Sequence, residues 1–225
     1  MSVHGPVVAH SLVEYFCARL ENKTDVLNYR AGVCEVASSL HILSKWKNFL
    51  PGDAGTIAIT IFELASGSIF KNQKPATRVK LYEVIDFLFK NFQKPLIRDV
   101  KLATLVSGLV SMAELEKNPS CLGILFPLYA HISQKWPLLH PEFKLIWDSF
   151  IRYFPVTVGG AAQDPAIPGK ELLRDLLLQC ILSNDSYAKE AIPRFIDMLD
   201  TSTDLSANVK VRTYSQCLSC ISNLE

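Results

Sequence analysis

Apolar residues recur at helical spacing along almost the whole chain. Leu81, Ile85, Leu88 and Phe92, for example, follow one another at intervals of four, three and four residues, which places them on one face of a helix. The alternation of apolar and polar residues that marks a strand is almost absent. The pattern therefore predicts an all-α protein, with helices over about residues 6–20, 26–46, 54–70, 75–92, 97–116, 119–135, 140–152, 168–181, 186–199 and 206–224.

One long segment, from Tyr153 to Gly169, lacks this periodicity. Its sequence, YFPVTVGGAAQDPAIPG, contains two adjacent glycines and three prolines, which break regular structure. Taken alone, such a segment is either a linker between two domains or a long loop inside one array of helices.

The spacing of the predicted helices favours the second interpretation. Taken in consecutive pairs, the first helices of the pairs begin near residues 7, 52, 97, 140 and 187, a period of about 45 residues that is typical of HEAT and armadillo repeats. We therefore expect one domain, residues 1–225, built as an α-solenoid of about five HEAT-like antiparallel helix pairs. The loop at about 153–169 then lies within the fourth pair. A small all-α domain of another topology is the alternative.

The last predicted helix stays apolar almost to the end of the chain, as CLSCISNL. A helical array normally ends in a capping repeat with a polar outer face. We therefore expect the chain to be a piece of a longer one, and its unpaired apolar end makes self-association possible.

Composition limits the kinds of partner. The chain has 23 basic and 22 acidic residues, a net charge of +1, and no cluster of lysine or arginine. Because a phosphate backbone is recognised through such a cluster, direct nucleic-acid binding is not expected. No apolar run reaches the roughly 20 residues of a membrane span, so membrane binding is not expected either. The cysteines are scattered, as is typical of reduced core cysteines in an intracellular protein, at positions 17, 34, 121, 180, 217 and 220.

Few residues suggest catalysis. Cys217 and Cys220 are separated by two residues, the one spacing in the chain that resembles a metal-binding or redox motif. However, a zinc site needs four ligands, and a thioredoxin motif needs a strand-to-helix junction. Glu114 and Glu116 are not on one helical face and indicate a solvated helix end. The histidines lack metalloenzyme pairing, at positions 4, 10, 41, 131 and 140. We therefore expect no catalytic, cofactor-binding or metal-binding residue, no cofactor and no enzyme. The alternative is a thiol or metal enzyme built on Cys217 and Cys220.

Two groups of residues could belong to a protein-binding surface. Aromatic residues are enriched at binding hot spots but are more often core, which is the interpretation we favour for Trp46, Tyr82, Phe89, Phe92, Trp136 and Trp147. Basic residues near the predicted turns could bind an acidic partner, although scattered solvated charge is favoured for Arg78, Lys80, Lys94, Arg98, Lys101, Lys144, Arg152 and Arg174. The protein-binding residues therefore stay unknown.

Several stretches, in order along almost the whole chain, resemble the N-terminal region of the MMS nineteen family. They include FCARLENKTDVLNYRAGVCEVAS, IFELASGSIFKNQKPATRVKLYEVIDFLF and the loop YFPVTVGGAAQDPAIPGKEL. The most specific positions of this resemblance are Arg19-Leu20, Pro75 with Arg78 and Tyr82, Tyr153-Phe154-Pro155, and Asp164-Pro165.

This resemblance implies a large HEAT-repeat scaffold of the cytoplasm and nucleus that works by protein binding. The family acts in the targeting complex that delivers iron–sulfur clusters to proteins of DNA replication and repair. It is also linked to nucleotide excision repair and transcription. The implied partners are the other subunits of the targeting complex, iron–sulfur DNA helicases and polymerases, and the transcription-factor helicase. A HEAT-repeat segment of a transport receptor or trafficking coat is the alternative function.

Overall fold

The computed structural model describes residues 4–21, 32–157 and 167–201, and these residues form helices without any strand. Their α-helices are α1 (His4–Glu21), α3 (Gly32–Ser44), α4 (Asp53–Ser66), α5 (Ser68–Lys71), α6 (Pro75–Asn91), α7 (Gln93–Asp99), α8 (Leu102–Met112), α9 (Pro119–Lys135), α10 (His140–Phe150), α11 (Lys170–Leu182) and α12 (Asp185–Thr201). A single 3₁₀ turn, Ile151–Tyr153, follows α10. The prediction of an all-α protein is confirmed for this part of the chain.

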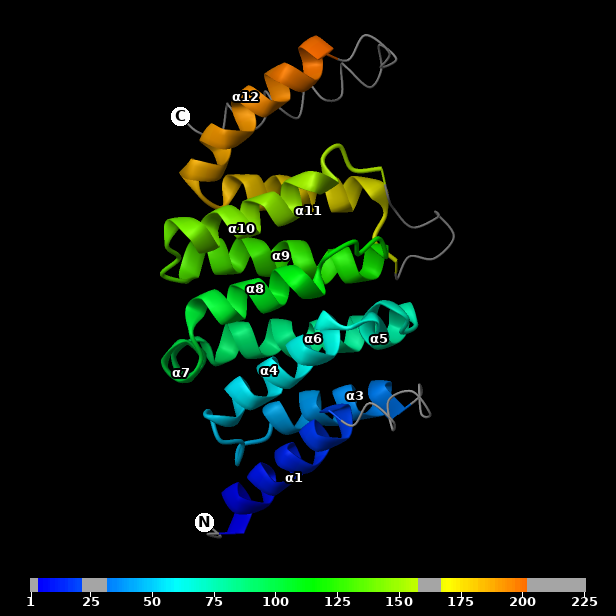
Figure 1. Cartoon of the computed structure of the whole chain (residues 1–225), viewed down its shortest axis with the longest axis vertical. Helices are drawn as coiled ribbons and strands as arrows, with labels where there is room; N and C mark the ends of the chain where they lie inside the picture. The colour runs from blue at the N-terminus through cyan, green and yellow to red at the C-terminus, as the bar shows by residue number, and fades with distance from the viewer. Residues whose placement is uncertain (1–3, 22–31, 158–166, 202–225) are drawn as a thin grey trace.

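The longer helices are stacked in two layers (Figure 1). In the first layer α1 packs on α4, α4 on α8, and α8 on α10. In the second layer α3 packs on α6, α6 on α9, and α9 on α11. Each helix therefore contacts the next helix of its own layer, and the stack extends from α1 towards α12 (Figure 1).

The chain crosses between the layers at two opposite edges of the stack (Figure 1). We name them after the short helices that mark them. The α5 edge consists of residues 67–74, 113–118 and 151–157, and the α7 edge of residues 45–52, 92–101, 136–139 and 183–184.

Two of the predicted helices are broken where the pattern suggested continuity. The helix expected over 54–70 is divided at Gly67, whose backbone is extended, into α4 and α5. The helix expected over 97–116 is also wrong, because α7 begins earlier, Val100 and Lys101 are extended, and α8 ends at Met112. Pro95, which lies between two of the predicted helices, is in the first turn of α7, where its missing N–H leaves no hydrogen bond unmade. Residues 26–31 and the helix expected at 206–224 lie outside the described residues.

Local signals explain the helices that were predicted well. The N-terminus of α9 is capped by Asn118, whose Oδ1 accepts the backbone N–H groups of Ser120 and Cys121, and Pro119 occupies its first position. Pro75 begins α6 in the same way. Each proline sets a helical backbone angle where no intrahelical donor is required.

The core runs along the contact between the layers. In α6, Tyr82 and Phe89 are fully buried, and Trp136 and Trp147 are 5% exposed, so the core interpretation of these four aromatic residues is confirmed. Phe92 is only partly buried, and Trp46 is 38% exposed, so the core interpretation is wrong for Trp46.

A glycine sets the distance between two first-layer helices. A Cβ on Gly108 of α8 would overlap the ring of Phe62 in α4. Since Phe62 is itself buried, any larger residue at 108 would push α4 and α8 apart.

The described cysteines behave as core residues. Cys17, Cys34, Cys121 and Cys180 are free, and all but Cys34 are buried. Burial raises the pKa of Cys17 to about 11 and that of Cys121 to about 12, so both thiols stay protonated at neutral pH. Cys217 and Cys220 lie outside the described residues.

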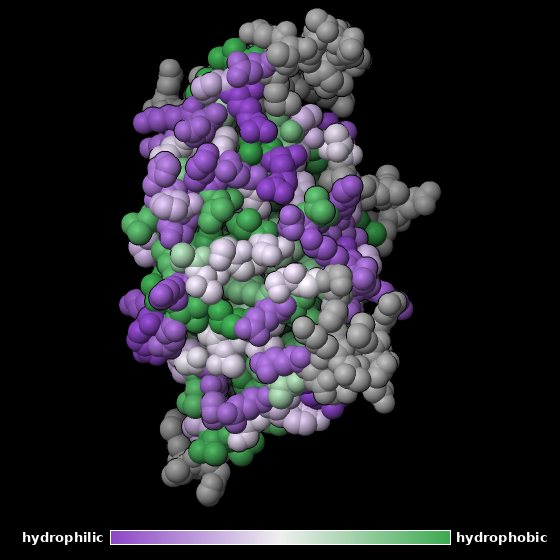
Figure 2. Space-filling model, viewed as in Figure 1, coloured by the Kyte–Doolittle hydropathy of each residue, from purple (hydrophilic) through white to green (hydrophobic). Residues whose placement is uncertain are grey.

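The surface polarity changes along the stack. Figure 2 shows the face formed largely by the first layer, where weakly polar and apolar side chains gather across the middle and hydrophilic ones gather towards α10 and α12. No helix in the described ranges combines the length and the apolar character that a membrane crossing requires.

Candidate functional site

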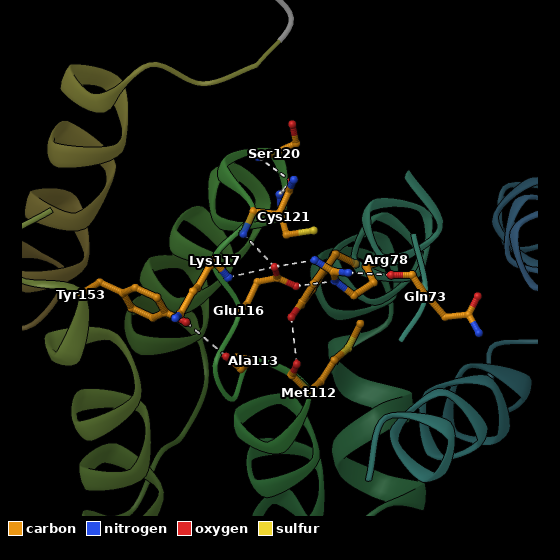
Figure 3. Close-up of polar contacts among 11 residues, drawn as sticks. Gln73, Arg78, Met112, Ala113, Glu116, Lys117, Ser120, Cys121 and Tyr153 are labelled. Carbon is orange, nitrogen blue, oxygen red and sulfur yellow. Dashed lines mark hydrogen bonds and ion pairs between the residues drawn. The ribbon is translucent and has the colours of Figure 1, made fainter. Parts of the chain in front are cut away.

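A buried ion pair joins α6 to the connection between α8 and α9 (Figure 3). Arg78, in the first turns of α6, donates from Nε to Glu116 Oε2 at 2.8 Å and from Nη2 to Oε1 at 3.0 Å. Its third nitrogen, Nη1, donates to the backbone carbonyl of Gln73 at 2.7 Å. The side chains of Arg78 and Glu116 are only 15% and 3% exposed. This two-point geometry is the strongest form of arginine–carboxylate pairing.

The backbone supplies the rest of the environment of Glu116. Its Oε1 also accepts the N–H groups of Lys117 at 3.0 Å and Asn118 at 2.8 Å. Burial by itself raises the pKa of the Glu116 carboxyl, but the hydrogen bonds from Arg78 and from the backbone of Asn118 and Lys117 outweigh it, and the pKa is lowered. On the other side, the hydrogen bond to Glu116 raises the pKa of Arg78. Both groups therefore stay charged and fully paired.

Two tyrosines bind the same connection from other elements. Tyr82, one turn beyond Arg78 in α6, donates its hydroxyl to the carbonyl of Met112 at 2.9 Å. Tyr153, in the 3₁₀ turn after α10, donates to the carbonyl of Ala113 at 3.2 Å (Figure 3). The last carbonyls of a helix have no intrahelical partner, so the hydroxyl of Tyr82 satisfies the carbonyl of Met112. The carbonyl of Ala113 also accepts the backbone N–H of Glu116 at 3.2 Å, so the hydroxyl of Tyr153 is its second donor.

We call Arg78, Tyr82, Glu116 and Tyr153 the clamp, because together they hold residues 112–118 from three elements. Residues from α6, from the segment before α9 and from the turn after α10 meet at one place on the α5 edge. Burial raises the pKa of Tyr82, and it raises that of Tyr153 to about 12, so both hydroxyls stay protonated as donors.

The clamp presents one apolar side chain to solvent. Leu115 has a φ of 62°, in the left-handed region, and is 67% exposed. A residue other than glycine in this conformation carries roughly 1–2 kcal/mol of strain. Beside it, the exposed Glu114 forms an ion pair with Lys71 at 3.0 Å. The protruding Leu115 is therefore held in place by the buried residues on either side of it.

The sequence-based interpretation of these residues was partly wrong. Glu116 was expected at a solvated helix end, and Arg78 among scattered solvated charges, but both are buried because they satisfy each other across 38 positions of sequence. Glu114 is exposed as expected. The side chain of Arg174 is likewise 15% exposed, in an ion pair with the exposed Glu171. The remaining basic residues of that group are exposed or intermediate, as expected.

A signal that could have found the clamp was present in the sequence. Arg78, Tyr82 and Tyr153 belong to the most specific positions of the family resemblance, and the structure brings all three to the same short connection. The sequence around Glu116 did not indicate its role, because no neighbouring residue marks it as the partner of a residue in another helix.

The histidines considered as metal ligands do not lie together at one site. His10 Nδ1 lies 2.8 Å from Asp53 Oδ1 at the α7 edge, and the hydrogen bond to Asp53 raises the pKa of His10. Burial lowers the pKa of His41 and of His131. His140 is the first residue of α10. Among the residues that the structure describes, no three His, Cys, Asp or Glu side chains are placed to hold a metal ion.

The arrangement is suited to holding a surface, since the charged groups of the clamp are already paired with each other. A general acid, base or nucleophile must be accessible to a substrate, whereas Glu116 is almost completely enclosed. What the clamp can do is fix the conformation of the α5 edge, including the exposed Leu115.

Comparison with known proteins gives two matches. The family model described as "Dos2-interacting transcription regulator of RNA-Pol-II" matches residues 7–225. The MMS19 nucleotide excision repair protein of Drosophila melanogaster is 28% identical over 131 residues, which cover 58% of this chain and 13% of that protein. No solved structure matches the chain significantly.

Proposed function

The chain belongs to the MMS19 family, whose N-terminal region it matches, and from this premise we propose that it is a non-catalytic scaffold segment. In this proposal it binds other proteins and helps deliver iron–sulfur clusters to proteins of DNA replication, repair and transcription. The observation that carries the proposal is the family match over residues 7–225. The matched part of the chain spans 13% of the relative's length, so the activity of the whole protein is part of the proposal.

The helix stack supports a scaffold architecture. The first-layer helices begin at His4, Asp53, Leu102 and His140, and α12 begins at Asp185, so pairs of helices follow one another at repeat-like spacing. We propose one domain, residues 1–225, made of about five HEAT-like pairs in an α-solenoid. The second helix of the fifth pair, expected at 206–224, lies outside the described residues. Such arrays offer long surfaces to protein partners.

The clamp supports a binding role for the α5 edge. A protein interface gains affinity when its contact residues are fixed before binding, because less conformational entropy is lost. Leu115 is an exposed leucine on a connection that the four clamp side chains, buried or partly buried, hold. It is thus a suitable contact residue for a protein partner.

The proposed partners follow from the family. They are the other subunits of the iron–sulfur targeting complex, iron–sulfur DNA helicases and polymerases, and the transcription-factor helicase, in the cytoplasm and nucleus. The relative is a nucleotide excision repair protein and the family is described as a transcription regulator of RNA polymerase II, which is in line with this proposal. Contact with these partners is through protein, without direct binding to nucleic acid or membrane.

The proposal is tested by affinity purification from cell extract, with the 225-residue chain as bait and the bound proteins identified by mass spectrometry. Bare resin and a Leu115→Ser bait are the controls, since residue 115 is exposed and its replacement leaves the core intact. We expect iron–sulfur DNA enzymes or transcription-factor helicase subunits with the unaltered bait, and less of them with Leu115→Ser.

Other outcomes would contradict the proposal. Recovery of small GTPases or of cargo carrying a transport signal would favour a transport receptor or trafficking coat. Recovery of chaperones alone would mean that these residues extend the helical array of a longer protein without binding clients themselves.

A further inference from the structure

A cavity of about 660 Å³ lies at the α7 edge, between α10 and the beginning of α12. Its apolar wall is formed by Leu138, Leu139, Phe143 and Trp147, from α10 and the turn before it. Its polar rim includes Lys144 of α10 and Lys189 of α12. Volumes of this size are typical of sites that bind small molecules or single anchoring side chains of a partner.

The cavity exists because α12 leaves the regular stack. Each earlier first-layer helix packs along the next one, whereas in the described residues α12 packs on α11 and diverges from α10 (Figure 1). The ring contacts between α10 and α12 all involve Tyr187, in the first turn of α12, which stacks on Phe143 at 3.9 Å and on Trp147 at 5.6 Å. The hydroxyl of Tyr187 also lies 3.0 Å from Ser133 Oγ in α9. One end of α12 is therefore fixed, and the space opens beyond it.

The wall of the cavity is accessible to a large apolar group. Leu139 is 67% exposed, although it lies beside the buried Trp147. Phe143 is partly buried, with its other face covered by Tyr187. A partner side chain placed here would contact aromatic and aliphatic carbon on a rigid, stacked support, which is the environment of binding hot spots.

The charges around the cavity favour an acidic ligand. Lys144 and Lys189 are both exposed, and no ion pair joins Lys189 to another described residue. Lys144 is 3.7 Å from Asp148, a loose and exposed pair. His140 of α10 and Ser186 of α12 also line the cavity. The N-terminus of α10 has no side-chain cap and directs the positive end of its helix dipole towards the cavity, whereas the N-terminus of α12 is capped by Asn184, whose Oδ1 accepts the N–H of Ser186. Glu190 is the acidic residue of the lining.

We propose that this cavity binds an acidic segment of a partner protein, which inserts one large apolar side chain between α10 and α12 and places neighbouring carboxylates at Lys144 and Lys189. The proposal rests on the proposed function in one respect, that the chain works by binding proteins. It names a surface on the edge opposite the clamp and the chemistry of the segment that occupies it.

The test is fluorescence anisotropy with a labelled synthetic peptide that carries one central phenylalanine flanked by aspartates in a glycine–serine background. We expect the 225-residue chain to bind it, and the Lys144→Glu/Lys189→Glu variant to weaken binding by about tenfold or more. Leu139→Asp should weaken it to a similar extent, since it places a charge against the ligand. Lys94→Glu is the matched control, because Lys94 is an exposed lysine on the same edge outside the cavity. All three replaced positions of the cavity are exposed, so circular dichroism of the variants should match that of the unaltered chain.

Peptide controls separate the two parts of the proposal. A peptide with serine in place of the phenylalanine should lose most of the binding. A peptide with asparagines in place of the aspartates should also lose most of it. Equal binding of the asparagine peptide would overturn the assignment of an acidic ligand. Equal binding by Lys144→Glu/Lys189→Glu and by the Lys94→Glu control would overturn the assignment of this cavity.

Two further results would overturn the inference while leaving the proposed function standing. The first is absence of peptide binding by a chain that still captures iron–sulfur enzymes from extract. The second is a dimer of the chain, measured by sedimentation, that Leu139→Asp dissociates, because the cavity would then be occupied by a second copy. Conversely, peptide binding at the cavity together with capture of chaperones alone would refute the proposed clients and keep the acidic-segment site.

Discussion

The two edges of the helix stack are built on opposite physical principles. The α5 edge is closed by the clamp, in which a buried arginine and a buried glutamate pair across 38 residues of sequence. Next to the α7 edge, the pair of His10 and Asp53 joins an imidazole that is 46% exposed to a carboxylate that is only 8% exposed, and the α7 edge itself opens into the cavity beside α12. One edge is therefore fixed internally, whereas the other leaves apolar surface and charge available.

Burial explains the difference. A charged pair removed from water is stable only when every hydrogen-bonding position is used, and Glu116 accepts two hydrogen bonds from Arg78 and two from the backbone. In the pair of His10 and Asp53 the carboxylate is also buried, but the imidazole is 46% exposed, so water can hydrate His10 if the pair opens. The comparison predicts that mutations at the two edges differ strongly in their effect on stability.

Glu116→Gln should have the largest effect. It leaves the guanidinium of Arg78 buried without a counter-charge, and we expect the free energy of unfolding to fall by about 3 kcal/mol. Urea denaturation followed by circular dichroism measures this loss. The matched control is Glu114→Gln, which removes the exposed partner of Lys71 and should cost about 0.5 kcal/mol or less. Equal losses in the two variants would show that the clamp is no stronger than a surface ion pair.

Tyr82→Phe should have the next largest effect. It leaves the carbonyl of Met112 without its hydroxyl donor inside the protein, and we expect a loss of about 1–2 kcal/mol. Tyr153→Phe is the comparison within the same edge, because Tyr153 is only partly buried and its hydrogen bond is longer, at 3.2 Å. A larger loss for Tyr153→Phe than for Tyr82→Phe would contradict the importance of burial at this edge.

The contrast between the edges also explains what the sequence could predict. Helices α6, α9 and α10 follow from apolar spacing and from Pro75, Asn118 and Pro119, which act within a few residues of sequence. The break at Val100 and Lys101 was missed, because nothing in the apolar pattern marks an extended dipeptide between two helices. Secondary structure is local enough to be predicted from periodicity and caps.

The clamp and the cavity depend on contacts that periodicity does not report. Glu116 lies three residues before the first residue of α9, where a solvated carboxylate is the ordinary expectation, and its burial requires Arg78 from another element. The cavity requires α12 to diverge from α10, which depends on how Tyr187 packs between Phe143 and Trp147. The family resemblance was a better guide to the clamp than periodicity, since it singled out three of the four clamp residues without assigning them a role.

Leu115→Gly should raise stability slightly, in contrast to every other change at the α5 edge. Glycine adopts a φ of 62° without strain, and this gain exceeds the greater chain entropy of glycine in the unfolded state by a few tenths to about 1 kcal/mol. Urea denaturation checks the gain, and the capture experiment checks partner binding, which should fall. Lowered stability would mean that Leu115 contributes to packing in spite of its exposure.

The smallest expected effect is a difference between the two ion pairs in how their contribution to stability depends on pH. The pKa of Glu116 is lowered from its ordinary value of 4.5, so the clamp contributes its full stability above that pH and loses it as the pH falls through the lower pKa of the folded state. The pKa of His10 is raised from 6.5 by its hydrogen bond to Asp53, so its contribution is complete below that pH and is lost as the pH rises through the higher pKa of the folded state.

Urea midpoints measured across the acid and neutral ranges test both signs. Glu116→Gln should remove the acid-side dependence that the clamp causes, and His10→Gln should flatten the small decline on the alkaline side of the titration. Proton NMR of the His10 ring gives its pKa directly, apart from any change in stability. A His10 pKa below 6.5 would reverse the sign of the neutral-range effect, and it would mean that the pair with Asp53 is not formed in solution.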